Sequence, residues 1–259
     1  VSPEAARDLL PARAADLIVD LIRQVSVARA RAGKKRVRIG LGGGGTIMRV
    51  AQALAARLRT EEKLPPLGIH AVSSGFRLGR PLSAPITFLS YFDQVPTDID
   101  YVGLFTPAVV PAKDYDRITA LPGVEESFRR AKTIDIVVTS LASADDEHGE
   151  LNQFMKMAGR QTKGDLDART VGDLQYNQYS NEGPITDLRP SVRAVSLFDL
   201  EGLRTFAAKK DKYVVVVAGP CGTCGATKVK AIRPLLQSPS LKVWTHLLLD
   251  SGTAQELLE

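Results

Sequence analysis

The chain has 259 residues, of which 44% are hydrophobic and 24% are charged, and this composition excludes an intrinsically disordered chain. No apolar run approaches the roughly 20 residues that cross a bilayer, and the N-terminus does not resemble a signal peptide. Two cysteines are too few for a disulfide framework. We therefore expect a cytoplasmic protein without a membrane partner, folded as a single domain over residues 1–259.

The net charge of +5 comes entirely from the first 40 residues, which carry nine basic and four acidic side chains. The rest of the chain holds 25 side chains of each sign. A basic segment can contact nucleic acid through its phosphates, but no aromatic residue lies within the basic run 29–38 to stack on bases. We interpret it as a solvated helix end and the turn before the first strand.

Hydrophobic periodicity predicts a chain in which strands and helices alternate. Ser2-Pro3-Glu4 is typical of a helix start, and a helix is expected over about 4–32, ended by Gly33. Strands as apolar as 134–138 and 214–217 indicate a mostly parallel sheet covered on both faces, a three-layer α/β/α Rossmann-like sandwich. Strands are expected at 37–41, 67–72, 86–90, 134–140, 193–197, 213–218 and 243–249, and helices at 46–59, 124–132, 201–209 and 227–233.

One segment interrupts this alternation. Residues 159–190 are polar and rich in Asp, Asn, Gln and Gly. They predict an insertion, either a long loop or a small appended hairpin, and loops of this length in a compact domain are usually functional.

The run Gly42–Gly45 with Thr46 lies between a predicted strand and a predicted helix. Glycines allow a sharp turn whose N–H groups converge, Thr46 can cap the helix, and the helix N-terminus attracts anions. The run lacks the Gly-Lys-Ser/Thr of a P-loop and the distant acid of a dinucleotide site. It predicts a phosphate-binding loop, with a purely structural turn as the alternative.

A second strand–loop–helix unit runs from 214 to 233. A lysine at the start of such a helix can reach an anion held at the strand ends. Lys228 and Lys230 diverge on a helix, and Lys228 is nearer the loop, so it is the predicted contact. The alternative is that both lysines are simply solvated.

Stretches spread along most of the chain resemble the sugar-binding effector domain of SorC-type bacterial transcription regulators, a family that ends on an Asp-x-x-Thr-Ala motif. The matching stretches are Gly40–Thr46, Arg129–Val138, Gly172-Asp173, Asn181-Glu182-Gly183-Pro184, Ala218-Gly219, Lys228–Ile232, Leu247–Leu249, Asp250–Ala254 and Leu257-Leu258. The resemblance implies the fold of ribose-phosphate isomerase, glucosamine-phosphate deaminase and the coenzyme A transferases. It also implies a phosphorylated sugar as ligand.

The same resemblance implies roles for individual residues. The loop Gly43, Gly44, Gly45 and Thr46 would hold the phosphate, and Lys228 would neutralise it. Asp173 would accept hydrogen bonds from sugar hydroxyls, and a second small-residue loop, Ser73, Ser74 and Gly75, would line the pocket. We expect no cofactor and no catalytic residue. DNA would be contacted only through a helix-turn-helix, which is not recognisable in this chain, and the chain is expected to form a homo-oligomer.

Two further motifs suggest other functions. Asp146, His148 and Asn152 loosely match the Asp-x-His…Asn spacing of the deaminases of this fold, so a sugar-phosphate isomerase or deaminase using His148 is the alternative function; a solvated acidic loop is the simpler interpretation. Cys221-Gly222-Thr223-Cys224 is a C-x-x-C between strand and helix, the position of a thioredoxin-like redox pair, so a thiol–disulfide protein is a third possible function. Two reduced loop thiols are the simpler interpretation. A metal there would need further ligands from three histidines, so no metal site is expected.

The confinement of excess positive charge to residues 1–40 predicts that this chain alone does not bind DNA sequence-specifically. Any affinity should arise from the basic residues between 29 and 38 and fall steeply with salt, because phosphate contacts release counterions. Fluorescence anisotropy with duplexes of unrelated sequence, at two salt concentrations, measures this. A discrete footprint on one operator sequence would contradict it.

Overall fold

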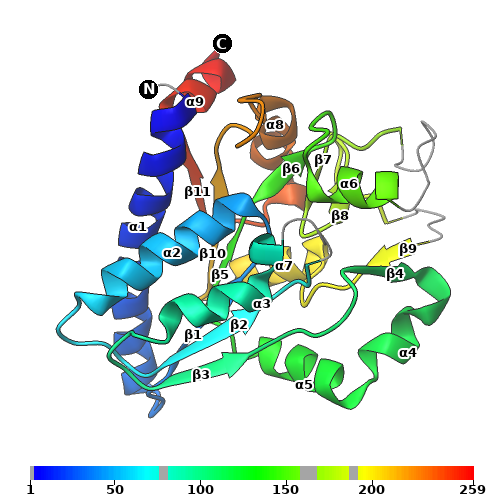
Figure 1. Cartoon of the computed structure of the whole chain (residues 1–259). Coiled ribbons are helices and arrows are strands. Elements are labelled where there is room, and N and C mark those ends of the chain that lie inside the picture. The colour runs from blue at the N-terminus through cyan, green and yellow to red at the C-terminus, as the bar shows by residue number, and fades with distance from the viewer. Residues whose placement is uncertain (1–2, 76–80, 158–167, 187–191) are drawn as a thin grey trace.

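The computed structural model describes residues 3–75, 81–157, 168–186 and 192–259. A six-stranded parallel sheet, in the order β11-β10-β5-β1-β2-β3, forms its centre (Figure 1). Its strands are β1 Val37–Leu41, β2 Leu67–Ala71, β3 Ile99–Val102, β5 Ile136–Thr139, β10 Tyr213–Ala218 and β11 His246–Leu249. The mostly parallel three-layer α/β sandwich predicted from the sequence is confirmed.

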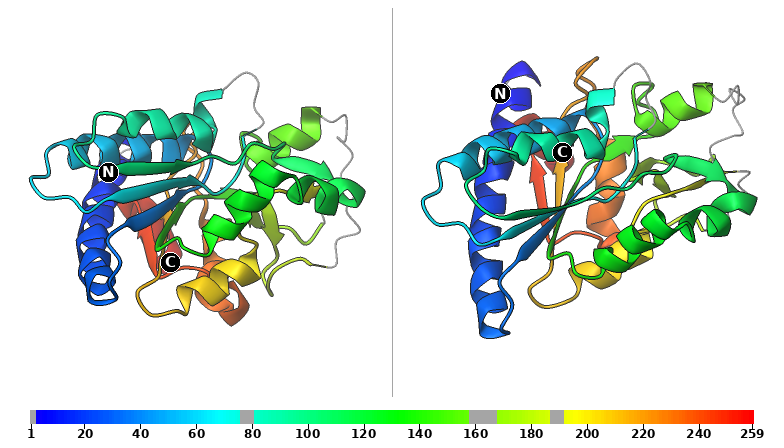
Figure 2. Two further views of the ribbon diagram at one scale, coloured as in Figure 1. Left: turned by 90° about the horizontal axis from the view of Figure 1, so that it is seen from below. Right: turned by 60° about the horizontal axis from the view of Figure 1, so that its bottom comes forward.

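Helices cover both faces of this sheet (Figure 2). Helices α1 (Pro3–Arg31) and α2 (Gly45–Arg59) pack on one face, and α5 (Pro122–Ala131), α7 (Leu200–Ala207) and α8 (Val229–Gln237) pack on the other. Alternate side chains of a strand point to opposite faces. Accordingly, Val215 and Val217 of β10 enter the first core, and Val214 and Val216 enter the second.

Two small antiparallel sheets lie beside the central one. Strand β4 (Val109–Pro111) pairs with β9 (Val192–Ala194), and β6 (Leu141–Ser143) pairs with the hairpin of β7 (Gly172–Leu174) and β8 (Asn177–Tyr179). This hairpin is one of the two forms expected for the polar insertion 159–190. Residues 159–167 and 187–190 of that insertion lie outside the described residues, as does the predicted helix cap Ser2.

The prediction of a strand at 86–90 is wrong. Pro85 occupies the first position of a short helix, α3 (Pro85–Phe88), which continues as a 3-10 turn over Leu89–Phe92. Proline is favoured at that position, and a short apolar run does not distinguish a strand from a helix. The remaining elements are α4 Tyr115–Thr119, α6 Glu150–Met157, α9 Ser251–Leu258 and 3-10 turns at Pro81–Ser83, Ala112–Asp114 and Pro239–Leu241.

The Asp-x-x-Thr-Ala motif at the end of β11 caps a helix. The Asp250 carboxylate accepts hydrogen bonds from the backbone N–H of Thr253 (3.0 Å) and from its hydroxyl (2.5 Å) at the start of α9. This N-cap satisfies a backbone donor that would otherwise lack a helical partner. Within the described residues, no helix combines the length and apolarity needed to cross a membrane.

A buried carboxylate joins the amino-terminal ends of the central strands. Asp135, just before β5, pairs with the Arg29 guanidinium of α1 and with Lys212 Nζ (3.0 Å) before β10. Its other oxygen accepts the backbone N–H of Arg38 in β1 (2.9 Å). One acid therefore anchors α1, β1, β5 and β10, and its side chain is only 3% exposed.

Replacing this carboxylate should destabilise the whole fold. Asp135→Ala leaves two largely buried cations without their shared partner, and breaking a buried ion pair typically costs about 3–5 kcal/mol. Urea denaturation followed by circular dichroism measures the free energy of unfolding. Glu201→Ala, which breaks an exposed pair with Arg204, is the control and should unfold like the wild type. Equal stability of the two variants would contradict the anchoring role of Asp135.

Candidate functional site

A cavity of about 540 Å³ opens at the carboxyl ends of β1, β5 and β10. Ligands of open α/β sheets bind at this edge. Eight of the ten predicted site residues line it: Gly43, Gly44, Gly45, Thr46, Ser73, His148, Asp173 and Lys228. The structure thus brings together residues that are up to 185 positions apart in the sequence.

The start of α2 forms one wall of the cavity. Gly44 precedes the helix with φ +99°, a left-handed conformation that glycine adopts without steric cost. The sequence assigned the cap to Thr46. That assignment is wrong, because Gly44 is the N-cap and Thr46 lies in the first turn, where no side chain caps the helix. The first N–H groups of α2 have no helical acceptor by geometry, and they border the cavity at Gly45 and Thr46.

The second small-residue loop contributes less than expected. Ser73 lines the cavity, and its hydroxyl accepts a hydrogen bond from Gly43 N–H (3.2 Å). Ser74 and Gly75 are not among the lining residues. The Ser74 hydroxyl donates to the carbonyl oxygens of Leu104 and Thr106 instead, and Gly75 packs against Ala84.

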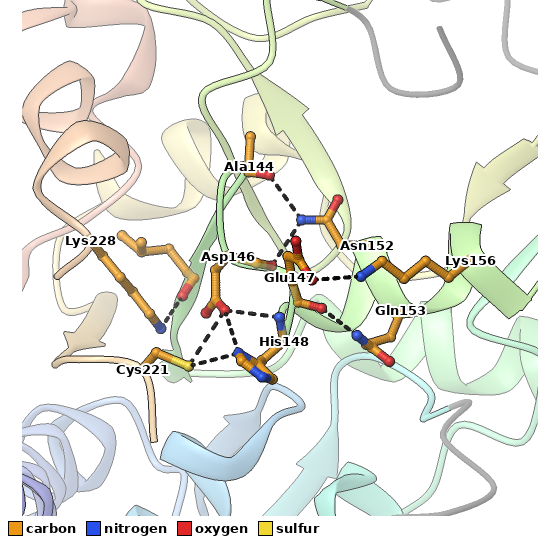
Figure 3. A network of polar contacts seen from close by, with 10 residues as sticks. Ala144, Asp146, Glu147, His148, Asn152, Gln153, Lys156, Cys221 and Lys228 are labelled. Carbon is orange, nitrogen blue, oxygen red and sulfur yellow. Dashed lines mark hydrogen bonds and ion pairs between the residues drawn. The ribbon is translucent and has the colours of Figure 1, made fainter. Parts of the chain in front are cut away.

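The two lysines at the start of α8 have different environments. Lys228 is buried and lines the cavity, and its Nζ donates to the carbonyl oxygen of Leu141 at 2.8 Å (Figure 3). Burial lowers the pKa of Lys228. The Lys230 side chain is 79% exposed and pairs with Asp145 at 2.6 Å. The predicted difference in direction between the two is confirmed, with Lys228 at the N-cap position rather than inside the first turn.

The β7–β8 hairpin forms the opposite wall. Its two-residue turn, Gln175 and Tyr176, has φ +51° and +67°. The Asp173 carboxylate accepts Tyr176 N–H at 3.1 Å, and the Tyr176 hydroxyl lies 2.7 Å from Glu150 Oε2. Burial raises the pKa of Asp173 to about 7, opposed by the Tyr176 hydrogen bond and the Lys228 charge.

The lining residues that the sequence did not indicate as site residues include Arg49, Glu150 and Gln175. Arg49 follows Thr46 by three positions, so helical spacing places both on one face and could have indicated it. The Gln175 amide is buried, and within the described part of the chain neither its Nε2 nor its Oε1 has a hydrogen-bond partner. Gln175 lines the cavity because it lies in the turn between β7 and β8. The composition of the insertion did not predict the position of this turn.

Two loops meet at the end of the cavity near Lys228. The acidic loop, residues 144–149, carries Asp146 and His148, and the cysteine loop, residues 219–227, carries Cys221 and Cys224. The Cys221 sulfur lies 3.4 Å from Asp146 Oδ1 and 3.8 Å from His148 Nδ1 (Figure 3). Burial raises the pKa of the Cys221 thiol, against the opposing effect of backbone hydrogen bonds from Cys224 and Thr223.

The raised pKa of Asp173 predicts a specific pH dependence of stability. Between about pH 4 and pH 7 the native chain holds a proton on Asp173 that the unfolded chain has lost, so stability falls as pH rises through this window. Below and above it, Asp173 contributes no slope. Asp173→Asn keeps an oxygen for Tyr176 N–H and removes the titration. Urea unfolding of both proteins from pH 4 to pH 8 should show the difference, and parallel pH profiles would exclude it.

The comparisons with known proteins agree with this architecture. The chain is similar to a probable sor operon regulator from Shigella flexneri, with TM-score 0.70, 16% identity, and coverage of 99% of this chain and 89% of that one. It is also similar to the full-length sorbitol operon regulator SorC from Klebsiella pneumoniae, with TM-score 0.72, 17% identity, and coverage of 100% and 74%. At these identities the likeness shows the fold. No curated protein matches the chain in sequence.

A family model shows the family directly. The model described as "Putative sugar-binding domain" matches residues 20–259, which is nearly the whole chain. The chain therefore belongs to this sugar-binding domain family, in agreement with its resemblance to the effector domain of SorC-type transcription regulators.

Proposed function

We propose that the chain is a sensor domain that binds a phosphorylated sugar in the cavity at the carboxyl edge of the sheet and catalyses no reaction on it. The observation that carries this proposal is that one cavity is lined by the first residues of α2, by the cationic side chains Arg49 and Lys228, and by the polar side chains Asp173, Glu150 and Gln175. A sugar phosphate needs both kinds of partner, donors and cations for its phosphate and polar groups for its hydroxyls.

The phosphate would bind at the start of α2. Backbone N–H groups of a helix N-terminus and its partial positive charge favour an anion. Arg49 and Lys228 add two cationic side chains to the same cavity. Burial of Lys228 makes an ion pair with phosphate stronger than one in water.

The sugar hydroxyls would bind at the hairpin end. Asp173 and Glu150 offer carboxylate oxygens, and Gln175 offers one acceptor and two donors. A buried amide without a partner costs free energy. Among the described residues the Gln175 side chain has no hydrogen-bond partner, so a ligand that pairs with it would offset this cost.

Regulation would need DNA contacts from outside this cavity. We propose that a helix-turn-helix element supplies them, that the chain works in the cytoplasm, and that it forms a homo-oligomer. The regulatory role is supported by two similar structures, those of a probable sor operon regulator and of the sorbitol operon regulator SorC.

Calorimetric titration with a panel of sugar phosphates and the corresponding free sugars tests the proposal. A ligand present at about 100 times its Kd should stabilise the fold by about 2.7 kcal/mol, measurable as a thermal shift. The phosphorylated forms should bind and the free sugars should not. Equal binding of both would remove the phosphate from the proposal.

An enzymatic function is the second candidate. His148 Nδ1 lies 3.4 Å from Asp146 Oδ1 and both residues line the cavity, so a general acid–base pair is present for sugar-phosphate isomerisation or deamination. Incubation with the tightest-binding sugar phosphates, followed by mass spectrometry and ammonia detection, decides between the two. Turnover that His148→Gln abolishes would replace the sensor by an enzyme.

The first-turn hydroxyl of α2 should contribute to phosphate binding. Thr46→Val preserves the side-chain shape and removes the hydroxyl, so affinity for a sugar phosphate should fall by about 1–2 kcal/mol, the value of a hydrogen bond to a charged group. Calorimetry of the wild type and the variant measures it. Unchanged affinity would mean that the glycine loop does not hold the phosphate.

Lys228, and not Lys230, should contact the phosphate. Lys228→Met should weaken binding by about 1–3 kcal/mol, because a charged partner in a partly desolvated site is lost. Lys230→Met is the matched control, and it should bind like the wild type because Lys230 is solvated and paired with Asp145. Thermal unfolding verifies that both variants fold. A larger loss at Lys230 would contradict the assignment.

A further inference from the structure

The acidic loop and the cysteine loop bring four metal-ligating side chains together. One ligand atom from each of Asp146, His148, Cys221 and Cys224 lies within 4.8 Å of all the others. Figure 3 shows the Asp146 carboxylate joined by dashed lines to both Cys221 and His148. The sequence alone offered a C-x-x-C pair without further ligands, and the fold adds an imidazole and a carboxylate.

The separations among three of these ligand atoms match a tetrahedral site, and the ligand atom of Cys224 lies within 4.8 Å of each of them. With bonds of about 2.3 Å to sulfur and about 2.0 Å to nitrogen or oxygen, tetrahedral ligand atoms lie about 3.3–3.8 Å apart. The observed separations are 3.4 Å from Cys221 sulfur to Asp146 Oδ1, 3.8 Å from that sulfur to His148 Nδ1, and 3.4 Å from His148 Nδ1 to Asp146 Oδ1.

The backbone of the cysteine loop forms a tight turn closed by two hydrogen bonds. Cys221 N–H donates to the Ala226 carbonyl oxygen at 2.8 Å, and Gly225 N–H donates to that of Cys221 at 2.9 Å. Gly225 has φ +74°, so the chain reverses immediately after the second cysteine.

Hydrogen bonds from the Asn152 side chain and within the loop itself fix the acidic loop. Asn152 Nδ2 donates to the carbonyl oxygens of Ala144 and Asp146, each at 2.9 Å. The backbone N–H of His148 donates to Asp146 Oδ1 at 2.9 Å, which fixes the carboxylate. Partners of this kind orient metal ligands. The His148 side chain is 41% exposed and Cys224 is exposed, so an ion can enter from solvent.

We propose that Asp146, His148, Cys221 and Cys224 form a tetrahedral binding site for a divalent transition metal, with Zn²⁺ as the ion that fits this donor set. Two thiolates and an imidazole exclude Mg²⁺ and Ca²⁺, which prefer oxygen ligands. Four protein ligands close the site, as in structural rather than catalytic zinc centres.

Metal binding would cross-link the two loops that border the proposed sugar site. Asp146, His148 and Cys221 line the large cavity, and Lys228 follows the cysteine loop directly. The ion would thereby fix the position of the Lys228 end of the cavity. The metal site itself does not depend on which ligand, if any, the cavity binds.

Zinc titration of the reduced, chelator-treated chain without any sugar tests the proposal. Competition with a chromogenic chelator gives the affinity, and native mass spectrometry gives the stoichiometry, expected to be one ion per chain. Co²⁺ in place of Zn²⁺ should give the intense ligand-field absorption of a tetrahedral ion and a thiolate-to-cobalt charge-transfer band. An octahedral cobalt spectrum would overturn the proposed geometry.

Matched variants locate the site. Cys224→Ser, His148→Gln and Asp146→Asn should each weaken zinc binding, the first two by more than about 100-fold, beyond the effect of losing an outer-shell partner. Asp145→Asn, the neighbouring acid paired with Lys230, and His246→Gln should bind zinc like the wild type. Circular dichroism verifies that each variant folds. Because Cys224 and His148 are both partly exposed, neither substitution should unfold the chain, so weaker zinc binding by both variants would mean that both side chains are ligands.

Equal zinc affinity in the wild type and in both Cys224→Ser and His148→Gln would overturn the proposal. So would a Cys221–Cys224 disulfide in the chain purified without reductant, together with no zinc binding after reduction, which would make the cysteines a redox pair. If the wild-type chain binds zinc but no sugar phosphate, the proposed function is contradicted and the metal site is not.

Discussion

The parallel alignment of β1, β5 and β10 is the constraint on which the site depends. Because neighbouring strands run in the same direction, the segments that leave their carboxyl ends emerge at one edge of the sheet. These segments are the glycine loop, the connection through β6 to the acidic loop, and the cysteine loop. At the opposite edge, Asp135 joins the beginnings of the same strands. Register fixed at one edge thus determines the site geometry at the other.

Burial of charge on the cavity wall prepares it for a polar ligand. Desolvation raises the pKa of Asp173 and lowers the pKa of Lys228, while the attraction between the two opposes both shifts. Each group is therefore less favourably charged than in water. An anion bound near Lys228 would favour its charged form, and hydroxyl donors would favour the ionised Asp173. Ligand binding and proton binding should consequently be linked at this site.

The sequence predicted the elements whose geometry is determined by local residue patterns. The apolar runs of β1 and β10 match their predicted bounds, and the glycine loop lies where a strand meets a helix. The cap was misassigned to Thr46 because a side-chain N-cap was expected. The N-cap is Gly44, which has a positive φ that glycine adopts without steric cost. Residues brought by tertiary pairing were not predictable: Gln175 depends on the β7–β8 turn, and the proximity of His148 to Cys221 depends on two loops 73 positions apart.

The hairpin turn shows how the fold holds a costly conformation at the cavity. Gln175 and Tyr176 both have positive φ, which glycine or asparagine normally occupies in such turns, and each such residue stores free energy. The surroundings enforce it: Asp173 accepts Tyr176 N–H, Asn177 Nδ2 donates to the Gln175 carbonyl oxygen at 3.1 Å, and the Tyr176 hydroxyl reaches Glu150. Glycine at these positions would relieve the strain and remove both side chains from the cavity wall. The strain therefore accompanies two side chains that line the cavity. The Gln175 amide is buried and has no hydrogen-bond partner among the described residues, which supports a role for it in ligand binding rather than in forming the turn.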